Sequence, residues 1–325
     1  MSDRCCGTIC VEEIDMILSV SRRTDIPALY SEWFMNRLRA GEVLVRNPMN
    51  FKQITPVPLS PRNIDCIVFW TKDPGNLCKY LNEIDQMGYT YYFTISINPY
   101  DKTIERNVGD KKGILKSVKN LSERIGRERV IWRYDPILFS ESIDTAYHIN
   151  WFAYISRELQ QYTDTCVISF LDEYKKIKKN LNDLHIIHPD FKTIHSIAQG
   201  FSEIAKKYSM KLATCSHDFD FTQFGIDRNK CIDDDLIEEL IGRKIQSKKD
   251  PFQRKDCGCI ESKDIGAYNT CTHDCQYCYA NSNKTLSYNN HKNHDPLAPL
   301  FYDTLRGDET ITPYKKHRSL VIDDK

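Results

Sequence analysis

The sequence lacks the features that would assign it to several large functional classes. No apolar run approaches the roughly 18 residues of a membrane-spanning helix, so no membrane segment is expected. Its 325 residues include 45 Lys plus Arg and 45 Asp plus Glu, which argues against a strongly basic surface for nucleic acid, although a local patch stays open. Residues 1–15 lack the apolar core of a secretory signal, which predicts a cytoplasmic protein.

Several catalytic motifs are missing as well. The sequence contains no GxxxxGK[ST], GxGxxG or GxSxG pattern, so nucleotide triphosphatase, dinucleotide-binding and serine hydrolase functions have no support. Its nine histidines form no HExxH array, which disfavours a catalytic zinc hydrolase.

Cysteine, in contrast, is abundant, with thirteen residues. Disulfides are rare in a reducing cytosol, so a local concentration of cysteines indicates metal or redox chemistry. Three cysteines occur singly in apolar or helical surroundings and are expected to be buried small side chains: Cys66, Cys78 and Cys166. Three more lie in residues 1–15, which we expect to form a variable or disordered extension: Cys5, Cys6 and Cys10.

An alternation of β-rich and helical segments dominates residues 16–220. The runs predicted as strands are apolar on both faces, as in a parallel sheet covered on both sides: 16–21, 66–71, 91–97, 130–136, 165–171 and 211–215. Helices are predicted between them: 27–40, 74–88, 112–125, 143–162 and 191–208, with a last one starting at 233–235. This order predicts an α/β fold with a parallel sheet, either open or closed into a barrel.

Two segments interrupt the alternation. The proline-rich residues 43–59 are predicted to form an excursion such as a small hairpin. Residues 282–325 are rich in Asn, His, Lys and Pro and are predicted to wrap the body as a loop-rich segment. The main domain is therefore expected to span 16–281 and to end in a cysteine-rich segment, 257–281.

Charged and polar residues follow nearly every predicted strand. The first strand runs into Ser21, Arg22, Arg23 and Asp25, and Arg133 lies within the fourth. The ligand site of a parallel α/β fold lies at the carboxyl ends of its strands. We therefore expect a polar cavity there, although a single such residue is usually only a helix cap.

The sequence CTHDCQYC places Cys271, Cys275 and Cys278 on one short loop. Three thiolates at this spacing suit an iron–sulfur cluster and leave one iron of a four-iron cluster free for another ligand. Zinc is the main competitor, because soft thiolates bind either metal, but zinc sites usually have four ligands from two cysteine pairs.

With Tyr277 before the last cysteine, this loop resembles the CxxxCxΦC signature of radical S-adenosylmethionine enzymes, where Φ is aromatic. Residues 262–270 (SKDIGAYNT) and 279–281 (YAN) around it resemble an uncharacterised bacterial family with such a C-terminal cluster. Residues 21–27 (SRRTDIP) and 66–74 (CIVFWTKDP) match the same family.

The resemblance implies a [4Fe–4S] cluster on the three cysteines, with S-adenosylmethionine on the fourth iron. Reductive cleavage would yield methionine and a 5′-deoxyadenosyl radical that abstracts hydrogen from a substrate, which the resemblance does not identify. It also implies an electron donor such as a ferredoxin or flavodoxin.

In most such enzymes the cysteine loop follows the first strand, whereas here it comes last. A permuted, partial (β/α) barrel would reconcile the two, with a final strand at 264–269 beside the first strand. In that arrangement Asp25 would accept from the methionine amine, and Arg22 or Arg23 would hold the carboxylate. The alternative is that Asp25 only caps a helix. Ser21, Tyr277 and Arg133 complete the expected cofactor-binding set.

Four further cysteines form a possible second metal site: Cys215, Cys231, Cys257 and Cys259. An auxiliary iron–sulfur cluster and a structural zinc are both open, as is simple burial of one or two of the thiols.

The sequence therefore predicts a radical S-adenosylmethionine-like enzyme. One alternative is a zinc-stabilised, cysteine-rich binding protein without radical chemistry. The other is a radical enzyme that acts on nucleic acid, because residues 132–136 (WRYDP) weakly resemble a strand of spore-photoproduct-lyase-like enzymes. That function would require the short basic runs of the chain to share one face.

Overall fold

A computed structural model describes residues 16–172, 174–215, 219–254 and 257–314. The extension 1–15, with Cys5, Cys6 and Cys10, lies outside the described residues, and so do 315–325.

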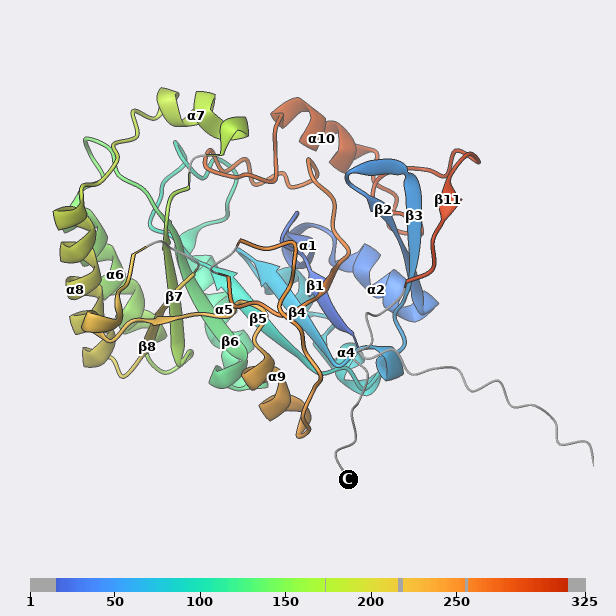
Figure 1. The fold of residues 1–325 in the computed structure, drawn as a ribbon, viewed down its shortest axis with the longest axis horizontal. Helices are drawn as coiled ribbons and strands as arrows, with labels where there is room; N and C mark the ends of the chain where they lie inside the picture. Colours follow the sequence, from blue (N-terminus) through green and yellow to red (C-terminus); the bar gives the residue numbers. More distant parts are fainter. Residues whose placement is uncertain (1–15, 173, 216–218, 255–256, 315–325) are drawn as a thin grey trace, which may run out of the picture.

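An eight-stranded, all-parallel sheet forms the centre of the molecule (Figure 1). Its order is β10-β1-β4-β5-β6-β7-β8-β9. The strands have these bounds: β1 Ile17–Val20, β4 Cys66–Thr71, β5 Tyr91–Ser96, β6 Val130–Ile137, β7 Thr165–Phe170, β8 Lys211–Thr214, β9 Asp227–Arg228 and β10 Lys263–Asp264. All six predicted strands are therefore present, and the predicted α/β class is confirmed.

The last strand of this sheet lies beside the first. β10 pairs in parallel with β1, with Leu18 opposite Lys263 and Ser19 opposite Asp264. The predicted adjacency is confirmed, but the strand ends at Asp264 instead of running from 264 to 269, because the Asp264 carboxylate accepts from Gly266 N at 3.0 Å and turns the chain. The pairings of the described residues leave β9 and β10 at opposite edges, so barrel closure is not shown.

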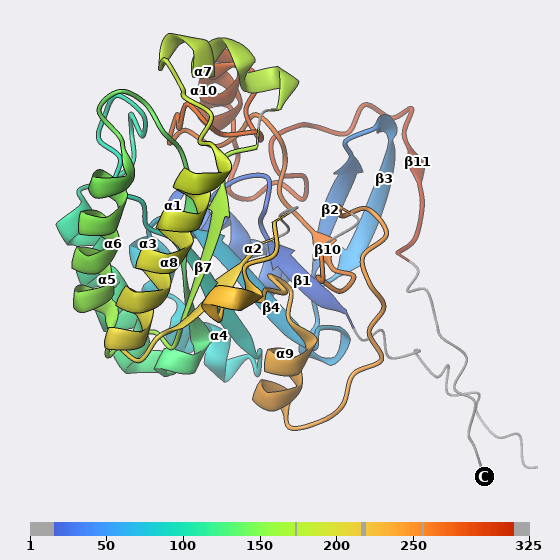
Figure 2. The same ribbon diagram turned by 60° about the vertical axis from the view of Figure 1, so that its left-hand side comes forward.

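Alternate residues of each strand face opposite sides of the sheet. In β4, Ile67 and Phe69 belong to the large core under the helices, whereas Cys66 and Val68 belong to a second cluster on the other face. Helices α5, α6 and α8 contribute to the first core, and α9 contributes to the second. Figures 1 and 2 show α9 apart from the α5, α6 and α8 group.

The helices follow the predicted positions, with two breaks. Their bounds are α1 Ile26–Leu29, α2 Ser31–Ala40, α3 Gly75–Cys78, α4 Leu81–Gln86, α5 Lys111–Ile125, α6 Thr145–Leu159, α7 Lys178–Asp183, α8 Phe191–Lys207, α9 Asp234–Ile241 and α10 Lys284–Lys292. The predicted helix 27–40 is broken at Tyr30, whose hydroxyl donates to Thr270 O at 2.5 Å. The predicted helix 74–88 breaks where Tyr80 N donates to Leu77 O. None of the described helices combines the length and apolar character needed to cross a membrane.

A small second sheet holds the two interrupting segments together. β2 (Glu42–Asn47) and β3 (Asn50–Pro58) form the predicted hairpin, and β11 (Thr310–Ile311) pairs in parallel with β3. The C-terminal segment was predicted to be loop-rich, but its described residues 282–314 contain α10 and β11, which were not predicted.

The buried His148 on α6 gives the fold a pH dependence. Its Nε2 donates to Leu138 O at 2.8 Å, so in the neutral ring its Nδ1 accepts from the Tyr134 hydroxyl at 2.9 Å, and protonation of Nδ1 would remove that acceptor. Burial lowers the pKa of His148 to about 4. As the pH falls, His148 takes up a proton in the unfolded chain before it does so in the folded protein. The contribution of the neutral ring to the free energy of unfolding should therefore be complete above about pH 6.5, and that free energy should fall by roughly 3 kcal/mol toward pH 4.

Urea unfolding between pH 4 and 7 measures this effect. His148→Gln should lose most of the slope, whereas His195→Gln, on the partly exposed part of α8, should keep it. Identical slopes in the wild type and His148→Gln would show that another group is responsible.

Candidate functional site

The cysteine loop, residues 271–278, is tied by backbone hydrogen bonds to the segment between β5 and α5. Gln276 N donates to Ile104 O at 2.9 Å, and Asn107 N donates to His273 O at 3.0 Å. Between these bonds, Glu105 and Cys275 form an antiparallel bridge. The backbone of the loop is thus fixed by main-chain contacts that do not use the cysteine sulfurs.

Burial favours the protonated form of all three thiols, and at each sulfur a neighbouring group opposes this effect. Burial raises the pKa of the Cys271 thiol to about 12, and the backbone N–H groups of His273 and Asp25 act against this rise. Burial likewise raises the pKa of Cys278, opposed by backbone N–H groups that follow it in the chain. Burial raises the pKa of Cys275 most strongly, and the Lys72 ammonium opposes it.

Zinc and a four-iron cluster require different arrangements of their cysteine ligands. Four thiolates around one zinc lie about 3.8 Å apart, the edge of a tetrahedron with Zn–S bonds of about 2.3 Å. Among the described residues, the sulfurs of Cys271, Cys275 and Cys278 do not all lie within 4.8 Å of one another. A four-iron cluster holds its cysteines further apart, because each sulfur binds a different iron. Three thiols on one loop match the ligand number of a four-iron cluster with one open iron, whereas a structural zinc usually has four protein ligands.

A buried network of ion pairs and hydrogen bonds lies against the inner side of the loop. Glu105, which is 1% exposed, accepts from Lys72 Nζ at 2.7 Å and also from Lys111 Nζ and the Tyr277 hydroxyl. Burial by itself would raise the pKa of Glu105, but the two ammonium groups hold it at about 2. Asn98 Nδ2 completes the network with a bond to the Tyr277 hydroxyl at 3.0 Å. Tyr277 is therefore held by hydrogen bonds on the inner side of the loop.

Asp25 joins the first strand end to the loop. Its Oδ1 accepts from Ala28 N at 3.0 Å, so the helix-capping role is confirmed. Its Oδ2 accepts from Lys72 N at 2.7 Å and lies 2.9 Å from His273 Nε2. His273 is only 7% exposed, because its ring turns inward to pair with Asp25. A ligand-binding role for Asp25 stays a prediction.

The residues that precede Asp25 are organised by a single carboxylate on β10. Asp264 accepts from the Ser21 hydroxyl at 2.6 Å, from the Ser19 hydroxyl at 2.9 Å and from Arg22 N at 2.8 Å. This contact explains why the last strand must lie beside the first: the conformation of residues 19–22 depends on a side chain more than 240 positions away.

The two adjacent arginines point to different surroundings. The Arg22 guanidinium donates to Ser262 Oγ at 3.1 Å, pairs with Asp250 at 3.5 Å and lies over the Trp70 ring. Arg23 instead lies 5.4 Å from the centre of the Tyr268 ring. Neither placement was evident from the sequence.

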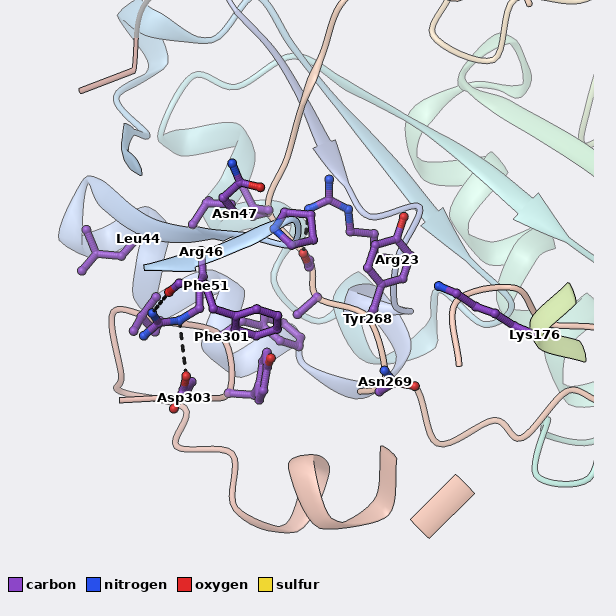
Figure 3. Close-up of a pocket in the computed structure, with 17 residues that line it drawn as sticks. Arg23, Leu44, Arg46, Asn47, Phe51, Lys176, Tyr268, Asn269, Phe301 and Asp303 are labelled. Carbon is purple, nitrogen blue, oxygen red and sulfur yellow. Dashed lines mark hydrogen bonds and ion pairs between the residues drawn. The ribbon is translucent and has the colours of Figure 1, made fainter. Parts of the chain in front are cut away.

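Arg23 lines a cavity of about 240 Å³ between the β2–β3 hairpin and residues 266–269 (Figure 3). Tyr268 lies between two cations there, with Arg23 on one side and Lys176 Nζ 5.3 Å from its ring centre. Asn269, which lines the same cavity, precedes Cys271 by two residues. The lining contains no cysteine among the described residues, so the cavity adjoins the loop without including its sulfurs.

Arg133 and the other four cysteines gather on the opposite face of the sheet from the large helices. Arg133 Nη1 donates to Cys231 Sγ at 2.9 Å, and Cys231 Sγ lies 3.4 Å from Cys215 Sγ. Cys259 Sγ accepts from Cys231 N at 3.2 Å, and Cys257 interacts with Cys259. The structure thus brings together all four thiols of the predicted second site.

Sequence reasoning missed Glu105 and Lys111. Glu105 lies in a loop without a motif, and only the neighbouring CIVFWTKDP run drew attention to Lys72. One signal was available: charged residues recur through 101–112, directly after a strand in a parallel fold.

Fold and site together define the class of this protein: it is an α/β protein with a parallel sheet and a cysteine loop at the carboxyl ends of the strands. The chain belongs to a family described as a domain of unknown function (DUF1848), whose model matches residues 17–280. No curated protein and no solved structure matches it. The matched range covers both cysteine groups and every strand of the large sheet.

Proposed function

We propose that this protein is a radical S-adenosylmethionine-type enzyme, with Cys271, Cys275 and Cys278 as the ligands of a [4Fe–4S] cluster. The observation that carries the proposal is the loop itself. Its backbone is fixed by main-chain bonds, and it supplies three thiols, the number of protein ligands for a four-iron cluster with one iron left open. When bound, such a cluster supplies the electron that cleaves S-adenosylmethionine to methionine and a hydrogen-abstracting radical.

The residues around the loop have separate tasks in this proposal. Lys72 places a positive charge beside Cys275, which offsets part of the negative charge of a thiolate-bound cluster. The pair of Glu105 with Lys72 and Lys111 keeps that charge in place. Asp25 and His273 connect the first strand end to the loop, which brings the Asp25 carboxylate near Cys271.

The arrangement of strands supports a permuted, partial (β/α) barrel. β10 leads directly into the cysteine loop and lies beside β1. In most such enzymes the loop follows the first strand, so this arrangement corresponds to that order with the chain beginning at a different point of the fold. Arg23 contacts Asp264 at 4.0 Å and Gly266 O at 3.4 Å, and Arg22 is engaged with Ser262 and Asp250. Of the two arginines only Arg23 lines the cavity, so it is the better placed to hold a ligand carboxylate.

Protein purified without oxygen tests the proposal directly. We expect about four irons with matching sulfide from the loop cluster, and formation of 5′-deoxyadenosine when the reduced protein is mixed with S-adenosylmethionine. A ferredoxin or flavodoxin would replace the chemical reductant in the cell. Protein with a full complement of iron and sulfide that forms no 5′-deoxyadenosine under any reducing condition would refute radical chemistry.

A further inference from the structure

A second group of four thiols lies outside the cysteine loop, and we infer that Cys215, Cys231, Cys257 and Cys259 form a second, thiolate-ligated metal centre. It binds either one zinc ion or a small iron–sulfur cluster. The inference stands independently of the proposed function, because none of these residues belongs to the loop at 271–278.

The four cysteines come from three separate parts of the chain. Cys215 follows β8, Cys231 precedes α9, and Cys257 and Cys259 lie in the connection from α9 to β10. In Figure 1 this connection, drawn in orange, crosses in front of the sheet. Their convergence is therefore a result of folding and not of sequence spacing.

The sulfurs follow one another as near neighbours in the order 215, 231, 259, 257. The first two are 3.4 Å apart, Cys231 interacts with Cys259, and Cys259 interacts with Cys257. Contacts this short suit two sulfurs on one metal ion, for which the ideal distance is about 3.8 Å. Among the described thiols, no three all lie within 4.8 Å of one another, so the outer sulfurs must move inward around a single ion or bind separate irons.

Hydrogen-bond donors are directed at these sulfurs from several sides. Cys231 Sγ accepts from Arg133 Nη1 at 2.9 Å and from Asn229 Nδ2 at 3.4 Å. Cys259 Sγ accepts from the backbone N–H groups of Cys231 at 3.2 Å and Ile232 at 3.4 Å. A thiol is a weak acceptor, whereas a metal-bound thiolate is a good one, so this concentration of donors favours thiolates.

Two arginines flank the group over one aromatic ring. Trp70 lies under the Arg133 guanidinium at 5.6 Å and under that of Arg22 at 6.0 Å. Each arginine also has a carboxylate partner, Asp135 for Arg133 and Asp250 for Arg22. Each guanidinium is thus held by a carboxylate, and the two cations adjoin Cys231 and Cys259.

The location of the four thiols indicates a structural role for a metal bound there. α9 and the residues around it cover one face of the sheet with a small apolar cluster. A metal held by Cys215 after β8, Cys231 before α9 and the 257–259 pair would fasten this covering segment to the sheet.

The test uses a chain in which Cys271, Cys275 and Cys278 are all replaced by alanine, purified without oxygen. We expect about one zinc per chain without sulfide, or iron with matching sulfide, and either result supports the inference and identifies the metal. Adding Cys231→Ala and Cys259→Ala should remove that metal, whereas adding Cys78→Ala, a half-buried thiol in α3, should not. A triple variant without zinc or iron would overturn the inference.

A second measurement needs no substitution. In the wild-type protein, alkylation followed by mass spectrometry should find the four thiols protected until a chelator is added. Equal alkylation before and after chelation, or a disulfide between Cys215 and Cys231, would overturn the inference. Because the first test uses a chain without loop cysteines, its failure would leave the proposed function untouched.

Discussion

Cys275→Ala is expected to reduce cleavage of S-adenosylmethionine to background while the fold is retained. The variant removes one of three cluster ligands, and the loop backbone does not depend on the lost sulfur, because its bonds run from Gln276 N and Asn107 N. The measurement is 5′-deoxyadenosine formed by the reduced protein, together with iron per chain and the thermal unfolding midpoint.

Cys78→Ala is the matched control for this prediction. It removes a half-buried thiol from α3, away from both cysteine groups, and should preserve iron content and cleavage. Full cleavage by Cys275→Ala would contradict the assignment of the loop as the cluster site. An unfolded variant would show instead that the loop is structural, which Cys275→Ser would then confirm or refute.

Glu105→Gln is expected to lower the free energy of unfolding by about 3–5 kcal/mol. The substitution keeps the shape of the side chain but leaves the Lys72 and Lys111 ammonium groups without a counter-charge, and the Lys72 side chain is only 12% exposed. Urea unfolding at neutral pH measures the loss.

A surface pair of the same length provides the control. Lys119 Nζ lies 2.7 Å from Glu158 Oε2, the distance found between Lys72 and Glu105, but both of its side chains are more than a quarter exposed. Glu158→Gln should therefore cost less than about 1 kcal/mol. Similar losses in the two variants would show that burial of the Glu105 network contributes nothing to stability.

The two cysteine groups divide the polar residues of the carboxyl edge between them. Lys72, Asp25 and Glu105 surround the loop, while Arg22 and Arg133 lie at the second group. Two metal centres on one sheet would allow each to be loaded or lost without the other. The loop substitutions leave Cys215, Cys231, Cys257 and Cys259 unchanged, so metal that remains in the triple loop variant belongs to the second group.

Local sequence patterns were sufficient for most of the secondary structure. Runs apolar on both faces identify buried parallel strands such as β4 and β5, because such strands are covered on two sides. Asp110 and Asp190 begin helices α5 and α8 as side-chain caps, which is a property of a few adjacent residues. The three-cysteine loop was also recognised from its spacing alone.

Element boundaries departed from prediction where a distant contact intervened. Tyr30 ends α1 because its hydroxyl bonds Thr270, and β10 stops at Asp264 because that carboxylate binds the residues of the first strand end. Neither contact can be predicted from ten or twenty neighbouring residues, because its two partners lie far apart in the chain.

By itself the sequence determined the strands, the caps and the presence of a compact cysteine motif, because these depend on neighbours in the chain. Tertiary structure alone decided that Glu105 lies beneath the loop, that His273 turns inward to Asp25, and that Arg22 and Arg23 point to different places. It also decided that four cysteines spread over 45 residues meet on one face. Parallel strands joined by long crossovers bring such residues together at one edge, and the partners are chosen by packing across the sheet.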